Sequence, residues 1–337
     1  MKKMVLVAAM LTMAGSAFAA DMPVKAVKAP PPAPFEPWDI AFGSAIMNDY
    51  IFRGVTQSNH QASVAAYFEP RYNVSKDLQL YVGVSGESIS FPNRAAAEVD
   101  IYGGIRPTFG MFALDVGLWG YLYPGGQCFN AGAGPGSGIP GSELNCILNG
   151  NIPFNNNVAK RDASFFEAYA KLAVTLNDQW TVGFNEYYSP NFLNLGAWGN
   201  YTSITAKWTA PSTIFGSSGV GMYVSGEVGR QWLGTSDAFY GVTSALANFA
   251  AGIPEPSYDT WNVGIGFTYK VFTLDLRYYD TDLSKASCNA FTSDYSTRNF
   301  SPAFVTPINP GGFGSNWCGA AGVAKLSADL TALTNLK

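Results

Sequence analysis

The chain has 337 residues and a formal net charge of −4, and only 13% of its residues are charged although 15% are aromatic. A soluble domain usually carries about 25% charged residues, so the composition argues against an ordinary soluble protein. The acidic balance offers no basic surface, and we expect no nucleic-acid partner. Beyond the first residues no run approaches ~18 consecutive apolar residues, so we expect no transmembrane helix, and a lipid-facing β-barrel is the remaining membrane class.

The first twenty residues have the features of an export signal. Lys2 and Lys3 give a basic start, residues 4–14 are apolar but too short to span a bilayer, and residues 17–19 read Ala-Phe-Ala. We therefore predict a signal peptide over residues 1–20 that is cleaved after export through the Sec pathway. Loss of the two lysines would change the net charge from −4 to −6.

Residues 21–37 form a proline-rich segment that includes the run Pro-Pro-Pro-Ala-Pro. Such a composition favours an extended, semi-rigid chain. We expect it to lie in the periplasm as a spacer, and a tether to the cell wall or to a partner is the alternative.

Twelve runs of alternating apolar and polar residues follow. In residues 272–279, for example, Phe, Leu, Leu and Tyr alternate with Thr, Asp, Arg and Tyr. A period of two places these two sets on opposite faces of a strand, and segments of about 10 such residues are typical of transmembrane barrels. We predict strands near residues 38–47, 63–74, 78–87, 97–108, 111–123, 164–175, 178–188, 200–210, 219–232, 258–270, 271–281 and 322–333.

The connections between these runs alternate between short and long. Short connections follow the even-numbered runs, and long ones follow the odd-numbered runs at 48–62, 88–96, 124–163, 189–199, 233–257 and 282–321. Outer-membrane barrels have short periplasmic turns and longer external loops. We therefore predict an all-β fold over residues 38–337: a transmembrane antiparallel up-and-down β-barrel of about twelve strands in the outer membrane, surrounded by lipid and lipopolysaccharide.

Aromatic residues gather near the predicted strand ends, where amphipathic rings suit the two membrane interfaces. The predicted periplasmic belt consists of Trp38, Phe112, Trp180, Trp208, Tyr269 and Phe272. The predicted outer belt consists of Trp119, Tyr121, Tyr123, Phe165, Tyr187, Tyr188, Tyr201, Trp232, Tyr258, Trp261, Tyr278 and Tyr279. A soluble β-protein with a tyrosine-rich core is the alternative, but it would not need the ordered alternation of connections.

The strand faces opposite to the apolar ones carry charged residues. The candidate pore-lining residues are Glu69, Arg71, Glu87, Glu98, Asp100, Arg106, Asp115, Glu167, Lys171, Lys207, Glu227, Asp275 and Arg277, and Lys325 and Asp329 share this face. Acids outnumber bases nine to six in this set. Rings of charge set ion selectivity, so we predict a narrow, water-filled pore with a mild cation preference. The alternative is a filled barrel whose charges pair across strands, narrowed further by inward tyrosines.

The four cysteines form two local pairs, Cys128 with Cys146 and Cys288 with Cys318, each within one long connection. An exported chain meets an oxidising compartment, which favours a disulfide in each loop. Free thiols are the main alternative. Neither pair has CxxC spacing or nearby histidines, so we expect no metal site and no cofactor.

The segment after the first predicted strand, Tyr50-Ile51-Phe52-Arg53-Gly54, resembles the start of the TorF-type porins, a proteobacterial outer-membrane family. The signal peptide and the strand series extend this likeness over most of the chain. The long segments 124–163 and 282–321 and the non-aromatic C-terminus depart from the family pattern. The resemblance implies a porin-like channel without a defined solute.

Two roles are open for Arg53 in this segment. It could neutralise carboxylates at the mouth of the barrel, with Gly54 allowing a tight turn. It could equally form an exposed salt bridge of small energetic value.

We predict passive diffusion of small hydrophilic solutes or ions, with a filled structural or adhesion barrel acting through stapled external loops as the alternative. The only histidine, His60, has Ser63 nearby, but residues three apart on strand-like backbone point to opposite faces and no G-x-S-x-G elbow is present. We therefore expect no enzyme. The sequence is compatible with a homo-oligomer but identifies no interface.

Overall fold

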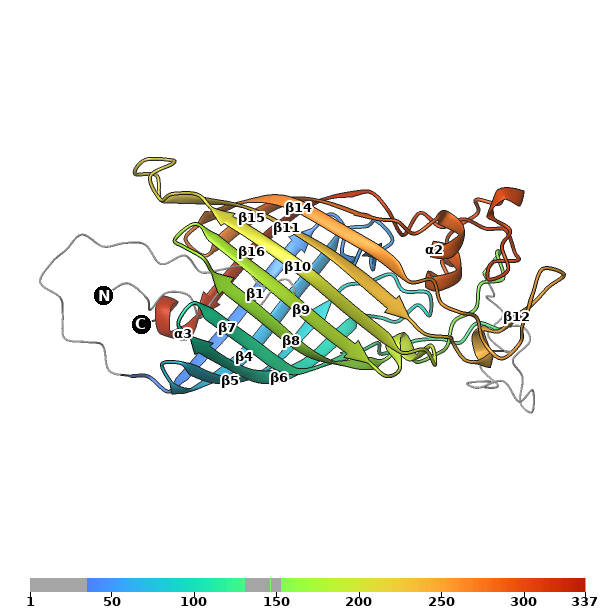
Figure 1. Ribbon diagram of the computed structural model, residues 1–337, viewed down its shortest axis with the longest axis horizontal. Helices are drawn as coiled ribbons and strands as arrows, with labels where there is room; N and C mark the ends of the chain where they lie inside the picture. The colour runs from blue at the N-terminus through green and yellow to red at the C-terminus, as the bar shows by residue number, and fades with distance from the viewer. Residues whose placement is uncertain (1–34, 131–145, 147–152, 337) are drawn as a thin grey trace, which may run out of the picture.

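Twelve antiparallel strands close into a single barrel in this computed structural model, which describes residues 35–130, 146 and 153–336. The predicted signal peptide and most of the proline-rich segment lie outside the described residues. The described chain starts at the same end of the barrel as its C-terminal helix, and the long connections extend from the opposite end (Figure 1). The predicted fold class is confirmed.

The barrel strands agree with the predicted ranges to within two residues. They are β1 (Trp38–Met47), β4 (Ser63–Ser75), β5 (Leu78–Glu87), β6 (Glu98–Phe109), β7 (Phe112–Leu122), β8 (Phe165–Thr175), β9 (Trp180–Ser189), β10 (Gly199–Thr209), β11 (Val220–Leu233), β14 (Tyr258–Tyr269), β15 (Phe272–Thr281) and β16 (Ala321–Thr331). Each strand pairs with its neighbours in sequence, as in an up-and-down barrel.

The connections contain short elements only. They are β2 (Ile51–Phe52), β3 (Val55–Thr56), β12 (Val242–Thr243), β13 (Asn248–Phe249), α2 (Lys285–Thr292) and the 3-10 turns Phe192–Asn194, Ala238–Tyr240 and Pro302–Phe304, followed after the last strand by α3 (Ala332–Asn335). Among the described residues no helix is long and apolar enough to cross a membrane.

The last strand closes the barrel although the chain lacks a terminal aromatic residue. β16 pairs with β15 on one side and with β1 on the other, from Ala41 opposite Thr331 to Met47 opposite Lys325. The strand is shorter than predicted, because Ala332 begins α3 and the backbone amide of Leu333 donates to Asp39 at 3.0 Å. This hydrogen bond holds the chain end beside the start of β1.

The outward face of the barrel is apolar. Ile101, Leu118, Ile204 and Val228 are among its exposed side chains, and each alternates with polar or small inward residues. Hydrophobic side chains in such a band suit lipid, and closure leaves no unpaired strand edge. A closed barrel with an apolar exterior is the architecture of outer-membrane β-barrels. Because short connections are periplasmic in such barrels, the end that carries the long connections is called the external end below.

Glycines make room for tyrosines inside the barrel. Tyr102 lies opposite Gly83 on the neighbouring strand, and Tyr169 lies opposite Gly117. A Cβ at either glycine would collide with the tyrosine ring. Each ring therefore lies flat over its neighbouring strand, which explains part of the high glycine content.

Eight of the twelve residues in the predicted outer aromatic belt point inward, so most of that prediction is wrong; Trp119 and Tyr279 line the interior of the barrel. Tyr121, Tyr123, Phe165, Tyr187, Tyr201 and Tyr258 are buried and point into the barrel or its cap. Adjacent residues in a strand point to opposite faces, so Tyr188 is 48% exposed toward lipid while Tyr187 is 8% exposed. Tyr188, Trp232, Trp261 and Tyr278 remain as exposed members of that belt.

The largest apolar cluster lies at the external end of the barrel, not between its walls. It joins strand-end rings such as Tyr121 and Phe165 to loop residues such as Phe91, Phe291 and Trp317. A membrane barrel exposes its apolar exterior to lipid, so in the described part of the chain the largest apolar cluster is the cap formed by the loops, and smaller clusters lie between the walls.

Candidate functional site

The interior of the barrel contains a cavity of ≈ 330 Å³ with charged walls. Eleven of the thirteen predicted pore-lining residues face it: Glu69, Arg71, Glu87, Asp100, Arg106, Asp115, Lys171, Lys207, Glu227, Asp275 and Arg277. Glu98 borders a second, outer cavity, and Glu167 is covered by a loop residue described below. The alternation of apolar and polar residues along the strands was therefore sufficient to identify the side chains that face the interior of the barrel.

One wall carries an ion-pair network centred on Arg106. Its Nη1 donates to Glu69 at 2.8 Å and its Nε donates to Asp115 at 3.3 Å. Arg71, two residues after Glu69 on the same face of β4, donates to the same carboxylate at 2.6 Å. The Tyr81 hydroxyl donates to Asp115 at 2.5 Å and also contacts the hydroxyl of Tyr169. Two carboxylates are thus held by two guanidinium groups.

The facing wall carries a second network centred on Asp275. Arg277, two residues away on β15, donates to it through Nε and Nη2 at 3.0 Å each. The Tyr223 hydroxyl donates to Asp275 at 2.6 Å, and Arg277 also donates to Asn262 at 2.6 Å. This network connects three adjacent strands.

Three carboxylates gather at the external end of the lumen. Cross-strand pairing sets Glu87 opposite Glu98, and one oxygen from each of Glu87, Glu98 and Asp100 lies within 4.8 Å of the others. Glu98 accepts hydrogen bonds from Tyr50 at 2.7 Å and Tyr123 at 2.9 Å. Among the described residues this is the one group whose side chains could jointly approach a metal ion. Tyr50 donates to one oxygen of Glu98 and Tyr123 to the other, so the two tyrosines supply hydrogen bonds but no positive charge to this group.

The first external loop folds inward as a hairpin. β2 and β3 pair with each other, and Arg53 and Gly54 form the turn between them with φ values of 47° and 79°. Two successive positive φ values are typical of the two-residue turns that fit twisted strands. A Cβ at Gly54 would lie 2.7 Å from the Thr260 hydroxyl, so the turn also needs glycine for its close approach to β14. We call residues 50–56 the plug hairpin.

The plug hairpin inserts Arg53 into a socket on the opposite wall of the barrel. Both guanidinium Nη atoms donate to Glu167 on β8 at 2.8 Å, and Nη1 donates to Gln231 on β11 at 2.9 Å. The guanidinium carbon also lies 4.4 Å from the Tyr201 ring centre and 4.9 Å from that of Tyr187. β8 and β11 are separated by β9 and β10, which lie across the barrel from β1.

The side chain of Arg53 is therefore buried, and its interpretation as an exposed salt bridge is wrong. Its side chain is 6% exposed and that of Glu167 is 0% exposed. A bidentate pair between aromatic faces uses the geometry that a guanidinium provides and an ammonium does not. Sequence reasoning located the residue but missed the socket, which consists of residues 114 and 178 positions away. The one indication in the sequence that Arg53 is buried was that the residues around it are apolar.

A second set of contacts ties the plug hairpin to the last external loop. The two ring nitrogens of His60 lie 2.6 Å from the Asp49 carboxylate and 2.9 Å from the Asn316 carbonyl. Both partners are acceptors, so the imidazolium form satisfies both. Asp49 also accepts from the hydroxyls of Thr56 and Ser58 at 2.5 and 3.0 Å. We call His60, with its two partners Asp49 in the same loop and the Asn316 carbonyl in the last loop, the loop latch.

The loop latch is expected to be firmest in mildly acidic solution. The hydrogen bond to Asp49 raises the pKa of His60 above its ordinary 6.5, against the effect of burial. Its contribution is therefore complete below pH 6.5 and is lost as pH rises through the raised value. Burial alone would raise the pKa of Asp49, but hydrogen bonds from His60, Thr56 and Ser58 bring it below its ordinary 3.8. That contribution is complete above pH 3.8 and is lost as pH falls through the lowered value.

Hydrogen exchange checks this expectation at the backbone amide of Thr56, which donates to the Trp317 carbonyl across the two loops at 2.9 Å. After correction for intrinsic rates, its protection should fall between pH 6 and pH 9 relative to amides of β4. A His60→Gln variant should show no such pH dependence. Equal protection at both pH values in the unmodified protein would contradict the role of the latch.

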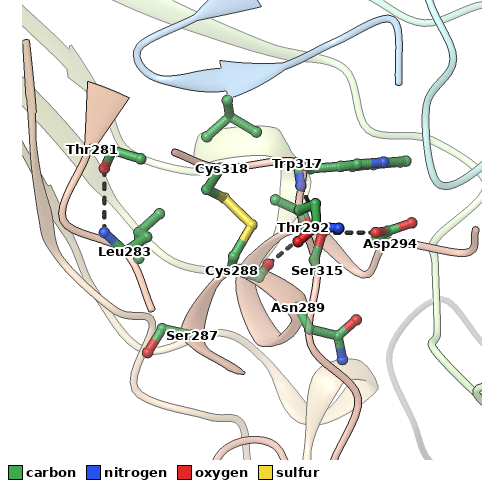
Figure 2. The surroundings of a disulfide bond; sticks show 12 residues. Thr281, Leu283, Ser287, Cys288, Asn289, Thr292, Asp294, Ser315, Trp317 and Cys318 are labelled. Atoms are coloured by element: carbon green, nitrogen blue, oxygen red, sulfur yellow. Dashed lines mark hydrogen bonds between the residues drawn. A yellow bond between two sulfur atoms is a disulfide. The ribbon is translucent and has the colours of Figure 1, made fainter. Parts of the chain in front are cut away.

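The predicted disulfide between Cys288 and Cys318 is present (Figure 2), and Cys318 adjoins the plug hairpin. It joins α2 to the segment that precedes β16. Cys318 forms a β-bridge with Val55 of the hairpin, and the indole of Trp317 donates to Asn59 at 2.7 Å. The disulfide thus fixes the surface against which the hairpin rests.

Replacing both Cys288 and Cys318 by serine is expected to loosen the external cap and leave the barrel intact. The bond closes a segment with a sequence separation of 30 residues. For such a loop, the chain-entropy model gives a loss of about 3–4 kcal/mol. Limited proteolysis should cut within residues 282–320 in the variant, while the strands stay protected by lipid. Unchanged proteolysis would show that other contacts hold this loop.

The predicted disulfide between Cys128 and Cys146 is also present. Of the connection 124–163, the described parts cap the mouth. The ammonium of Lys160 donates to the Asn194 carbonyl at 2.7 Å and to Asp237 at 2.5 Å, and Asn155 donates to the Asp294 carbonyl at 2.6 Å. These contacts join three other external loops. The glycine-rich part of the connection lies outside the described residues.

Comparison with protein families identifies one similarity. Residues 32–133 match the model of a family described as a bacterial protein of unknown function (Gcw_chp). The matched segment contains the first five barrel strands and the plug hairpin. The TorF-type porins are not among the families found, so that resemblance stays a prediction. No match was found among curated proteins.

Several solved outer-membrane proteins have a similar architecture. An outer membrane channel from Pseudomonas putida F1 is 9% identical, with 90% of this chain and 100% of that chain covered and a TM-score of 0.42. LpxR from Salmonella typhimurium is 9% identical, with 86% and 99% covered and a TM-score of 0.38. A FadL homologue from Pseudomonas aeruginosa is 12% identical, with 87% and 89% covered and a TM-score of 0.36. With identities and TM-scores this low, the likeness concerns the fold alone and assigns no substrate to this chain.

Proposed function

We propose that this protein is a narrow outer-membrane channel for passive diffusion of small hydrophilic solutes or ions, closed at its external end by the plug hairpin. The supporting observation is the ≈ 330 Å³ lumen with charged side chains from both walls. Charged groups are costly in a dry interior, so a cavity with this lining favours water. Such a lining also sets which ions enter.

The balance of charge supports a mild cation preference. Nine acids and six bases share the inward face of the strands, and Arg53 from the plug hairpin raises the number of bases to seven. With the hairpin docked, the excess of acids is smaller than the strands alone suggest. Withdrawal of the hairpin would therefore both open the lumen and strengthen the preference for cations.

A filled structural barrel is the second candidate, favoured by the ion pairs that join Glu69, Arg106 and Asp115 across strands. In that case the stapled external loops would carry the function, for example adhesion. Catalysis is not proposed. Both ring nitrogens of His60 are engaged by Asp49 and Asn316, and Ser63 donates instead to the Ser88 carbonyl at 2.7 Å.

Single-channel conductance of the refolded protein in a planar bilayer, at two salt concentrations, tests the channel proposal. Discrete current steps that grow with salt support a channel, and the reversal potential in a salt gradient tests the cation preference. A correctly refolded barrel that stays silent, even when the plug hairpin is released by the Arg53 variant described below, would favour the filled barrel. An anion-favouring reversal potential would reject the preference alone.

The proposal includes export through the Sec pathway with cleavage of residues 1–20, and residence among outer-membrane lipid and lipopolysaccharide. Mass spectrometry of the mature chain tests the cleavage. Assembly into a homo-oligomer is compatible with this function but is not required by it, because the lumen lies within one chain.

A further inference from the structure

The three carboxylates at the external end of the lumen are like charges that strand pairing holds together. Glu87 ends β5 and lies directly opposite Glu98, which begins β6, and Asp100 follows two residues later on the same face. Like charges at directly opposed positions destabilise a sheet. One oxygen from each of the three side chains lies within 4.8 Å of the other two. We call these three residues the acidic cluster.

In the described part of the chain, no lysine, arginine or histidine forms an ion pair with the acidic cluster. The two hydrogen bonds to Glu98 come from neutral tyrosine hydroxyls. Lys325 lines the same lumen and acts on Glu87 from beyond ion-pair distance. The networks around Arg106 and Asp275 each contain guanidinium groups, so the acidic cluster differs from both.

Two oxygens of the acidic cluster have no hydrogen-bond donor in bonding geometry among the described residues. They are Oδ1 of Asp100 and Oε2 of Glu87, and both atoms are buried. Asp100 is only 3% exposed, and its other oxygen accepts from the Ser85 hydroxyl at 3.0 Å. A buried charge is costly unless it is paired or coordinates a metal ion. Asp100 and Glu87 both line the lumen, so an ion can reach them from there.

The spacing and the ligand chemistry favour calcium. Ca²⁺ binds oxygen at about 2.3–2.6 Å, so two oxygens on one ion can lie about 5 Å apart. The 4.8 Å limit within the acidic cluster fits this range. Mg²⁺ binds at about 2.0–2.1 Å, accepts a separation of only about 4 Å and gives up its water reluctantly. Carboxylate oxygens without imidazole or thiolate ligands do not suit zinc or copper.

We propose that the acidic cluster binds one Ca²⁺ ion, with Glu87, Glu98 and Asp100 as its protein ligands and water from the lumen completing the coordination. Tyr50 of the plug hairpin donates to Glu98, so an ion that keeps Glu98 ionised also favours the docked hairpin. The site goes beyond the channel function and does not depend on conduction. It departs from the sequence-based expectation of no metal site, which rested on the cysteines.

Calorimetric titration of CaCl₂ into the refolded full chain, in a neutral detergent and after removal of divalent ions with EDTA, tests the proposal. Glu87→Gln removes one ligand charge with little change of shape. Glu227→Gln is the matched control, because Glu227 lines the same lumen outside the acidic cluster. We expect one saturable site in the unmodified protein and in Glu227→Gln, with affinity at least about tenfold lower in Glu87→Gln. MgCl₂ should bind more weakly than CaCl₂.

Thermal unfolding gives a second measurement. CaCl₂ should raise the unfolding midpoint of the unmodified protein and of Glu227→Gln, relative to NaCl at the same ionic strength, because an ion that binds only the folded state stabilises it. Glu87→Gln should show little of this increase. Asp100→Asn removes another ligand charge and replaces Glu87→Gln if that variant does not fold.

Two results would overturn the site. One is the absence of saturable binding up to about 10 mM CaCl₂, well above the range of weak extracellular calcium sites, which would show that protons alone neutralise the acidic cluster. The other is equal binding in Glu87→Gln and Glu227→Gln, which would place the ion elsewhere. Conductance is measured separately: a silent barrel that binds calcium rejects the channel alone, and a conducting barrel that does not bind it rejects the calcium site alone.

Discussion

An Arg53→Ala variant is expected to conduct far more than the unmodified protein at the same salt concentration. The substitution removes the guanidinium group that lies against the rings of Tyr187 and Tyr201 and that neutralises Glu167. Removing one partner of a buried ion pair costs about 3–5 kcal/mol, because the other charge is left uncompensated. The lost free energy destabilises the docked position of the plug hairpin relative to a position outside the lumen. We therefore expect the hairpin to leave the lumen and the carboxylate to become hydrated.

The chain offers a matched control for this experiment. Arg230 pairs with Asp259 at the same 2.8 Å distance, but the two side chains are 43% and 49% exposed. An exposed pair contributes about 0–1 kcal/mol, so Arg230→Ala should leave the conductance unchanged. Arg53→Lys should give an intermediate conductance, since it keeps the charge but loses the bidentate geometry. Equal conductance in Arg53→Ala and Arg230→Ala would show that Arg53 does not close the lumen.

An Arg106→Met variant is expected to lower the free energy of unfolding of the barrel by about 3–5 kcal/mol. Arg106 is the shared partner of Glu69 and Asp115, and all three side chains are buried. Methionine keeps much of the volume but leaves Asp115 with only Lys171, its neighbour across the strands, and Glu69 with Arg71 alone. Urea-induced unfolding from lipid vesicles, followed by tryptophan fluorescence, measures the loss.

Arg71→Met is the control for this second prediction. Arg71 also pairs with Glu69, but its side chain is 15% exposed and Glu69 keeps Arg106 when it is removed. We expect a loss of about 1 kcal/mol, near that of an ordinary hydrogen bond. In Arg106→Met, an added Glu69→Gln substitution should recover part of the loss because it removes a buried carboxylate that has lost one of its two guanidinium partners. Equal losses in Arg106→Met and Arg71→Met would contradict a central role for Arg106.

The barrel was predictable because a strand between lipid and water leaves a strong pattern in the sequence. Glu69 and Arg71, or Asp275 and Arg277, are two residues apart, and this spacing alone places them on the inward face. The turn at Gly110 and the turn at Lys270 limit the strands on either side to a narrow range. The closing strand was recognisable for the same reason, although the terminal aromatic residue was missing.

The interior contacts were not predictable, because the pattern reports the face of a residue and not its neighbours. Tyr187 and Tyr188 were both predicted to belong to the outer belt, because aromatic residues are common near strand ends whether they face lipid or the interior. Only the alternation within the folded strand separates the lipid-facing ring from the one against Arg53. The plug hairpin had a weaker signal: Arg53 and Gly54 stand between apolar residues that an exposed loop does not need.

The socket of Arg53 has a consequence for the order of assembly. Glu167 and Gln231 lie 114 and 178 residues beyond it and on strands that are not neighbours. Contacts between such distant parts of a chain form late, because the intervening chain must first be organised. The hairpin near the N-terminus is thus made early but finds its binding surface only after β8 and β11 stand in place. This order predicts a stage of assembly at which the wall of the barrel is complete but the plug hairpin has not yet docked, so that the hairpin does not yet close the lumen.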